Sequence, residues 1–219
     1  MTMVVAIYTG QGLAEPLKAI FTELLPNCRL INIIDDSLIA DVVKSQRVTP
    51  AVTRRLLRYY EIAAEMGANV ILNTCSSVGE VVELGRQVVE IPIVRIDEPM
   101  ALAAVKQYDR IGVIATLPST LQPTMRLLQD QARRLYRPVT IVEGLAAGAY
   151  EALVSGVPAQ HDQCILETAL RLKPQVDAFV LAQGSMARME RVLAEATGKP
   201  VFSSLRLGIE AVKQTLAEG

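Results

Sequence analysis

Short apolar runs alternate with longer amphipathic stretches along the whole chain, and this alternation constrains the fold more than any other feature. Val4–Tyr8 is a typical run: it is apolar, it is closed by Thr9-Gly10, and Pro16 then stands where a first helical turn tolerates proline. Strands are predicted at Val4–Tyr8, Leu30–Ile34, Val70–Leu72, Ile91–Ile96, Ile111–Ala115, Val139–Val142, Ala178–Ala182 and Pro200–Phe202. Helices are predicted after Pro16, at Thr49–Met66, from the cluster 73–80 onward, at Leu121–Leu135, around Gln160–Leu172, at Met186–Thr197 and at Leu207–Leu216. The sequence therefore predicts an α/β fold with parallel sheets covered by helices on both faces.

The two halves of the chain repeat the same pattern. The segment Val4-Val-Ala-Ile-Tyr-Thr9 matches Ile111-Gly-Val-Ile-Ala-Thr116, and Ala68-Asn-Val-Ile-Leu-Asn-Thr-Cys75 matches Asp177-Ala-Phe-Val-Leu-Ala-Gln-Gly184. A single matched pair could be two unrelated βα units, but several pairs in the same order favour a duplication. We expect two similar α/β/α units related by a pseudo-twofold axis. The first comprises residues 1–98 with 206–219 and carries Cys75, and the second comprises 99–205 and carries Gly184.

Composition excludes several classes of function. The formal net charge is −1, so nothing in the electrostatics favours a nucleic acid or an anionic membrane as partner. No apolar run is long enough to span a bilayer, and the N-terminus does not resemble a signal peptide. Three cysteines and one histidine, all scattered, predict neither a disulfide framework nor a metal site. We expect free thiols in a reducing cytoplasm, and the sequence leaves the oligomeric state open, a homo-oligomer included.

Small polar or glycine-containing clusters follow four of the predicted strands, where parallel α/β sheets bind their ligands. They are Thr9-Gly10-Gln11-Gly12, Asn73-Thr74-Cys75-Ser76-Ser77, the range 116–120, and Gly184-Ser185. If the two halves face each other, the clusters converge in one inter-domain cleft. Each cluster also precedes a helix, whose free N–H groups favour an anion. A small carboxylate suits this arrangement better than a nucleotide, because Gly10-Gln-Gly12 is only a fragment of a dinucleotide motif and no phosphate-binding loop is present.

Cys75 is the candidate catalytic residue. It stands at the predicted start of a helix, where the dipole and the neighbouring hydroxyls are expected to lower the thiol pKa. Such a thiol can exchange a carbon-bound proton or attack carbon, although a cysteine buried only for packing is the alternative. For Cys28 and Cys164 the packing interpretation is favoured. His161 is expected to face solvent at a helix start, and a pair with Cys164 is the alternative.

With these residues in place, the sequence resembles the Asp/Glu/hydantoin racemase superfamily over essentially its whole length. The resemblance rests on the duplicated halves, on Asn-Thr-Cys-Ser-Ser (73–77), on Ile-Gly-Val-Ile-Ala-Thr-Leu-Pro-Ser (111–119) and on Leu-Ala-Gln-Gly-Ser-Met (181–186). It implies two α/β/α domains with the site between them, no metal or other cofactor, and two cysteines that act on opposite faces of a substrate α-carbon. One thiolate removes the α-proton, and the other thiol returns a proton from the opposite side.

The resemblance also assigns roles to single residues. Cys75 matches the first catalytic cysteine, and the implied substrate-binding residues are Thr9, Gly10, Gln11, Asn73, Thr74, Ser76, Thr116, Ser119, Gly184 and Ser185. Thr9 and Gly10 stand where glutamate racemases have an Asp-Ser pair. Gly184 is expected at the place of the second cysteine, and glycine cannot move a proton. Arylmalonate decarboxylases and maleate isomerases are similar relatives in which one cysteine carries the chemistry.

Three functions follow from this pattern. The first is a cofactor-independent racemase or isomerase that acts at the α-carbon of a small carboxylate, amino acid or hydantoin-type substrate, with Cys75 as acid/base. The second is a decarboxylase or lyase in which Cys75 is a one-sided proton donor or a nucleophile. The third is a non-catalytic protein that binds a small carboxylate, with Cys75 purely structural.

Overall fold

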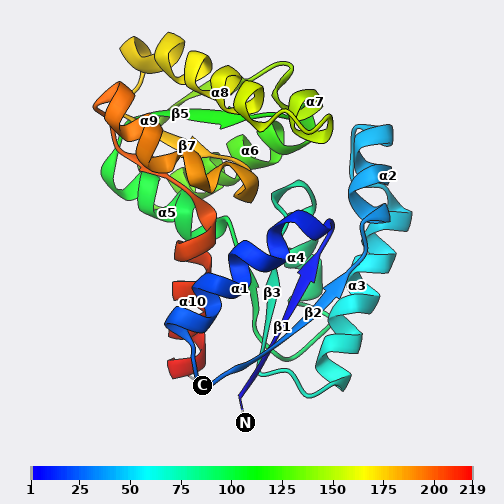
Figure 1. Cartoon of the computed structure of the whole chain (residues 1–219). Helices are drawn as coiled ribbons and strands as arrows, with labels where there is room; N and C mark the ends of the chain where they lie inside the picture. Colours follow the sequence, from blue (N-terminus) through cyan, green and yellow to red (C-terminus); the bar gives the residue numbers. More distant parts are fainter. Residues whose placement is uncertain (1, 219) are drawn as a thin grey trace. The chain divides into compact units, whose positions relative to one another are not determined.

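The computed structural model describes residues 2–218, which divide into two compact units of the same α/β architecture (Figure 1). The first unit runs up to Pro99 and includes the stretch from Leu205 onward, and the second is Met100–Ser204. Each contains a four-stranded sheet whose strand pairs are all parallel. The predicted fold class is therefore confirmed.

The first unit is built on the strand order β2-β1-β3-β4. Its elements are β1 (Met3–Tyr8), α1 (Ala14–Leu24), β2 (Arg29–Ile34), α2 (Ser37–Ser45), α3 (Pro50–Glu65), β3 (Val70–Asn73), α4 (Val81–Gly85), β4 (Ile93–Arg95) and α10 (Ser204–Glu218), with 3₁₀ turns at Gln11–Leu13 and Ser76–Val78. Helices α2, α3 and α4 bury their apolar faces against Val5 and Ile7 of β1 and their neighbours on β3 and β4. Helices α1 and α10 lie side by side on the other face, where Arg206 pairs with Glu23 (Figure 1).

The second unit has the order β6-β5-β7-β8. Its elements are α5 (Glu98–Gln107), β5 (Arg110–Ala115), α6 (Pro118–Arg134), β6 (Thr140–Leu145), α7 (Ala149–Val154), α8 (Pro158–Leu172), β7 (Ala178–Leu181), α9 (Glu190–Thr197) and β8 (Val201–Phe202), with 3₁₀ turns at Lys173–Gln175 and Gly184–Met189. Helices α7, α8 and α9 share one apolar cluster with Ile114, Phe179 and Leu181 of the sheet. Helix α6 covers the opposite face (Figure 1).

The order of elements in the second unit repeats that of the first, including a pair of consecutive helices after the second strand. Local signals explain several boundaries. Helix α3 begins as predicted, because the Thr49 hydroxyl caps the Val52 N–H at 3.3 Å and Pro50 fills the first helical position. After α9, Gly198 adopts the left-handed conformation (φ +67°) that glycine accepts without strain.

Several parts of the secondary structure differ from the predictions. Helices α2 and α7 were not predicted, because each is short and begins directly after a strand-closing turn. In α2, Leu38 and Val42 are one helical turn apart and both are buried, which is the signal that identifies the helix in retrospect. The cluster 73–80 opens a 3₁₀ turn and the five-residue α4 rather than a long helix, and α6 begins at Pro118 rather than Leu121.

Candidate functional site

Hydrogen-bond donors surround the sulfur of Cys75 at the carboxyl end of β3. The residue caps the 3₁₀ turn Ser76–Val78 in an extended conformation (φ −121°, ψ 117°), and its side chain is half-buried. The hydroxyls of Thr9 and Ser77 and the backbone N–H groups of Ser77 and Val78 all donate to the sulfur. These donors would stabilise a thiolate formed during a reaction.

The resting pKa of Cys75 nevertheless differs from the prediction. Burial raises the pKa above its ordinary value of 9.0, and this outweighs the lowering by the hydrogen bonds from Thr9, Ser77 and Val78. The predicted lowering is therefore wrong. The polar neighbours are visible in the sequence, but the apolar cluster against which the cysteine packs forms only in the fold. At neutral pH Cys75 is a thiol.

Polar contacts beneath the cysteine fix the path of its loop. The Asn73 side chain donates from Nδ2 to the Cys75 carbonyl at 3.1 Å and accepts at Oδ1 from the Tyr60 hydroxyl at 3.1 Å. The Thr74 hydroxyl donates to the Ile7 carbonyl at 2.9 Å, which ties the loop to β1. Asn73 and Thr74 were predicted to contact substrate, whereas here their side chains hold the backbone that positions Cys75.

A buried ion pair supports the same loop from the side of β4. Arg95 donates from Nε and Nη2 to the two carboxylate oxygens of Asp97, at 2.7 and 3.0 Å, and both side chains are buried. Burial alone would lower the pKa of Arg95, but the Asp97 carboxylate holds it above its usual range. The guanidinium packs so closely on Gly79 that a Cβ there would lie 2.4 Å from Nε. Arg95 and Asp97 thus form a structural support for the loop.

The other predicted residues of the first unit differ in exposure. Thr9 and Ser76 are buried, Gly10 is half-buried, and Gln11 is exposed with its amide donating to Asp36 Oδ2 at 3.2 Å. In this group, Thr9 donates a hydrogen bond to the cysteine sulfur. Thr9 is adjacent to Cys75 because β1 and β3 are paired and both end at this edge.

In the second unit, the position that corresponds to Cys75 is held by Gln183. In matching ladders, the Thr74 N–H donates to the Ile7 carbonyl at 3.1 Å, and the Ala182 N–H donates to the Ile114 carbonyl at 2.9 Å. The residue after Thr74 is Cys75, and the residue after Ala182 is Gln183. Cys75 and Gln183 each cap a 3₁₀ turn in an extended conformation, with φ −128° and ψ 138° at Gln183. The assignment of Gly184 to this place is therefore wrong by one residue. Gly184 corresponds to Ser76.

Gln183 is hydrogen-bonded to the residue that follows β5, as Cys75 is to the residue that follows β1. Its Oε1 accepts from the Thr116 N–H at 2.7 Å, and its Nε2 donates to the Thr116 hydroxyl at 2.8 Å. Thr116 is the counterpart of Thr9 in the sequence repeat. Ser185 is exposed, and Gly184 is half-buried. That the clusters of the two halves meet in one cleft stays a prediction.

Among residues 2–218, three buried polar side-chain atoms lack a hydrogen-bond partner: Tyr8 Oη, Ser119 Oγ and His161 Nε2. Ser119 was predicted as a substrate contact, and it lies in the first turn of α6. His161 is fully buried, contrary to the prediction that it faces solvent, and its Nδ1 lies 2.8 Å from Asp162 Oδ1. Asp162 also pairs with Arg188 of the turn that begins at Gly184. Cys28 and Cys164 are half-buried.

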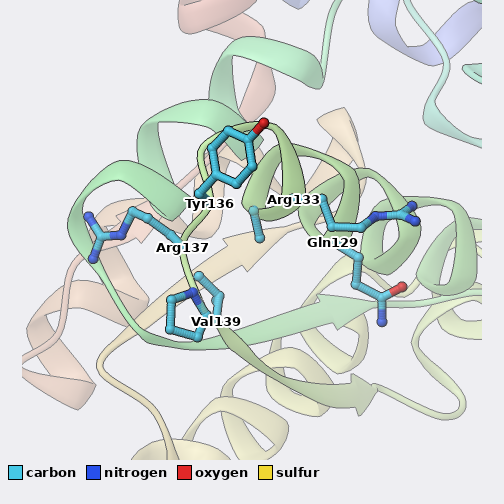
Figure 2. A pocket seen from close by; sticks show the side chains of 7 residues that line it. Gln129, Arg133, Tyr136, Arg137 and Val139 are labelled. Carbon is cyan, nitrogen blue, oxygen red and sulfur yellow. The ribbon is translucent and has the colours of Figure 1, made fainter.

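A surface pocket of the second unit is lined by other residues. It is lined by the end of α6 and the segment that leads into β6: Gln129, Ala132, Arg133, Tyr136, Arg137, Pro138 and Val139 (Figure 2). The pocket borders the amino end of β6, and in a parallel sheet that is the edge opposite to Thr116. None of the predicted site residues lines it. Within the described residues no group of three or more His, Cys, Asp or Glu side chains could hold a metal, and no helix is long and apolar enough to cross a bilayer.

Comparison with known proteins gives consistent results. The model of the Asp/Glu/hydantoin racemase family matches residues 4–212. The fold is similar to that of a glutamate racemase from Francisella tularensis in complex with D-glutamate (TM-score 0.77, 13% identity, 99% of this chain and 81% of that chain). It is also similar to an allantoin racemase from Klebsiella pneumoniae (0.71, 16%, 100% and 89%) and to a glycine-to-cysteine mutant of arylmalonate decarboxylase with associated sulfate (0.64, 15%, 99% and 94%). No curated protein sequence matches significantly.

Proposed function

The chain belongs to the Asp/Glu/hydantoin racemase family, and on that premise we propose that it moves a proton at the α-carbon of a small carboxylate, with Cys75 as the acid/base. The observation that carries this proposal is the set of donors around the Cys75 sulfur: two hydroxyls and two backbone N–H groups. A cysteine kept only for packing has no need of them. They provide the stabilisation that a thiolate requires when the proton has left.

The raised pKa of Cys75 makes the thiol, rather than the thiolate, the resting form. A resting thiol is a proton donor. In the donating step the S–H bond breaks, the proton goes to the α-carbon of an enolate-like intermediate, and the electron pair stays on sulfur. Thr9, Ser77 and Val78 then donate to the new thiolate until solvent returns a proton.

The position that would carry a second cysteine supports one-sided chemistry. A carboxamide such as that of Gln183 neither donates nor takes a proton near neutral pH. Its oxygen and nitrogen are also both engaged with Thr116. A racemisation with two equal thiols is therefore not available to this chain, and a second base, if the reaction needs one, must be a water or another side chain.

This asymmetry favours a decarboxylase as the second candidate function. In that reaction the bond between the α-carbon and a carboxylate breaks, CO2 leaves, and the electron pair remains as an enolate. Cys75 then delivers its proton to one face, and no base has to remove a hydrogen first. A protonated resting cysteine is the form that this reaction needs, whereas removal of an α-proton needs the thiolate.

Recognition of the substrate is proposed to use the polar turn residues of both units. Thr116 and Ser119 remain the proposed contacts of a carboxylate, with Gly184 and Ser185 beside them. Ser119 supports this assignment, because its buried hydroxyl has no partner within the described protein. No cofactor is needed for the chemistry proposed. A protein that only binds a carboxylate is the remaining alternative, and the donors around Cys75 argue against it.

Incubation in D2O separates the candidate functions. The purified protein is mixed with each enantiomer of glutamate and aspartate, with allantoin, with a 5-substituted hydantoin and with phenylmalonate. Recovered material is then analysed by mass spectrometry and chiral chromatography. Racemisation or isomerisation predicts deuterium at the α-carbon without loss of CO2, and decarboxylation predicts CO2 with one deuterium of a single handedness.

Two cysteine variants complete the design. Cys75→Ala is expected to abolish the turnover, and Cys28→Ala serves as the matched control that retains it. Turnover that survives in Cys75→Ala would exclude the acid/base role.

A further inference from the structure

Tyr8 has a buried hydroxyl for which the fold provides no partner. The residue is the last of β1, directly before Thr9, and it is fully buried. Its hydroxyl has no hydrogen-bond partner among the described residues. An unpaired buried hydroxyl destabilises a protein, so such groups need an explanation.

The location of Tyr8 connects it with the cysteine. Tyr8 ends the strand that pairs with β3, and the next residue donates to the Cys75 sulfur. Strand residues alternate between faces: Ile7 belongs to the apolar cluster with α2, α3 and α4, so the Tyr8 ring lies on the other face. Burial there raises the pKa of the Tyr8 hydroxyl, and the negative charge of Glu15 adds to the effect. Tyr8 itself is the last residue of β1, so it lies at the carboxyl edge of the sheet, the edge where Cys75 follows β3.

The fold itself does not require the hydroxyl. The position that corresponds to Tyr8 in the second unit is Ala115, which ends β5 in the same way and is also buried. The other large buried tyrosine of the first unit has a structural use, since the Tyr60 hydroxyl donates to Asn73. Tyr8 therefore differs both from its counterpart in the repeat and from its neighbour in the unit.

We propose that the Tyr8 hydroxyl is a substrate contact that donates a hydrogen bond to an oxygen atom of the bound carboxylate or of the enolate that it forms. The inference rests on the proposed function for the identity of the ligand. A tyrosine held in its neutral form remains a donor over the whole physiological range of pH. It supplies a donor that carries no charge and needs no lysine or arginine, and the clusters at residues 9–12 and 73–77 contain neither.

The test compares Tyr8→Phe with Tyr60→Phe. Stability is measured first, by urea unfolding without ligand. Because the Tyr8 hydroxyl has no partner in the protein, we expect Tyr8→Phe to be as stable as the wild type or more stable. Tyr60→Phe loses the hydrogen bond to Asn73, so we expect it to be less stable. If Tyr8→Phe is destabilised as much as Tyr60→Phe, its hydroxyl is paired in the protein and the proposal is overturned. This arm needs no ligand, so its outcome does not depend on the proposed function.

Binding is measured next, with D-glutamate, L-aspartate, allantoin and phenylmalonate as probes, by the shift of the 13Cζ resonance in protein labelled at tyrosine. Tyr8→Phe identifies the Tyr8 signal. A probe that binds is expected to shift this signal and to bind or turn over roughly 3- to 10-fold less well in Tyr8→Phe, the range of one neutral hydrogen bond. Equal affinity and kcat/KM in both proteins would overturn the contact. Loss of turnover in Cys75→Ala together with unchanged kinetics in Tyr8→Phe would leave the proposed function standing and refute only the role of Tyr8.

Discussion

Replacement of Gly79 by alanine is the sharpest structural test of how the cysteine loop is held. A Cβ at this position would lie 2.4, 2.5 and 2.7 Å from Nε, Cζ and Nη2 of Arg95. The guanidinium must therefore shift, and we expect the shift to break its two bonds of 2.7 and 3.0 Å to the buried Asp97. Breaking a buried ion pair while one charge stays buried costs about 3–5 kcal/mol.

That cost is a large fraction of the roughly 5–15 kcal/mol by which domains are stable. If the free energy of unfolding falls by about 2 kcal/mol per molar urea, a loss of this size lowers the urea concentration at the unfolding midpoint by roughly 1.5–2.5 M. Circular dichroism measures the midpoint. Gly12→Ala is the matched control, because its Cβ would meet nothing within 4 Å. Its stability is expected to remain within about 1 kcal/mol of the wild type.

A double-mutant cycle tests the cause of the effect. In an Arg95→Met background the guanidinium is absent, so the addition of Gly79→Ala should cost much less than it does alone. A Gly79→Ala protein within about 1 kcal/mol of the wild type would refute the reasoning. Equal costs in the two backgrounds would refute the assignment to Arg95.

The remaining predictions concern the sulfur and its counterpart. Alkylation of Cys75 by iodoacetamide, followed by mass spectrometry of its peptide, should rise with a midpoint above pH 9.0, because burial raises the thiol pKa; a midpoint near pH 7 would contradict this. Thr9→Val removes a donor to the sulfur and should move that midpoint further up, whereas Thr9→Ser should restore it. The free energy of unfolding should fall as pH rises from 9.0 through the higher pKa of folded Cys75, because the folded state keeps a proton that the unfolded chain releases; Cys75→Ser should show a smaller fall over that window. Gln183→Cys should increase the rate at which the α-proton of the substrate exchanges with D2O, relative to both the parent protein and Gln183→Ala.

The parts of the fold that the sequence predicts are those determined by local pattern. Alternating runs such as Val4–Tyr8 are buried strands because their neighbours on both faces are apolar, and Thr49-Pro50 starts a helix through contacts within one turn. Cys75 was located for the same reason, since the end of an apolar run is the end of a strand. Short helices such as α2 escape this reasoning. A few residues carry little periodic signal, and the packing of Leu38 and Val42 on the sheet supplies the stability.

Properties that depend on distant parts of the chain were harder to predict. The hydroxyls near Cys75 are adjacent in sequence, but the burial that decides the direction of its pKa comes from an apolar cluster drawn from several elements. Arg95 and Asp97 look like surface residues in a charged stretch, yet they are buried as a pair against Gly79. His161 was predicted at the surface because it stands among polar residues at a helix start, although it lies one turn before the buried Ile165 on the same helical face.

The one-residue difference between Gly184 and Gln183 changes the chemical argument. Comparison of the turn sequences alone does not show which residue of the second unit corresponds to Cys75. The hydrogen bonds from the Thr74 and Ala182 N–H groups to the neighbouring strands show that Thr74 corresponds to Ala182, and Cys75 therefore to Gln183. A glycine at the second position would lack a side chain, and the question would be what fills its place. A glutamine fills the place itself, and its amide makes two bonds to Thr116 that parallel the single bond from Thr9 to Cys75. Both units thus keep a hydrogen bond between the turn and the residue after their first strand, but this place is held by a thiol in the first unit and by a carboxamide in the second, which supports the proposed delivery of the proton from Cys75.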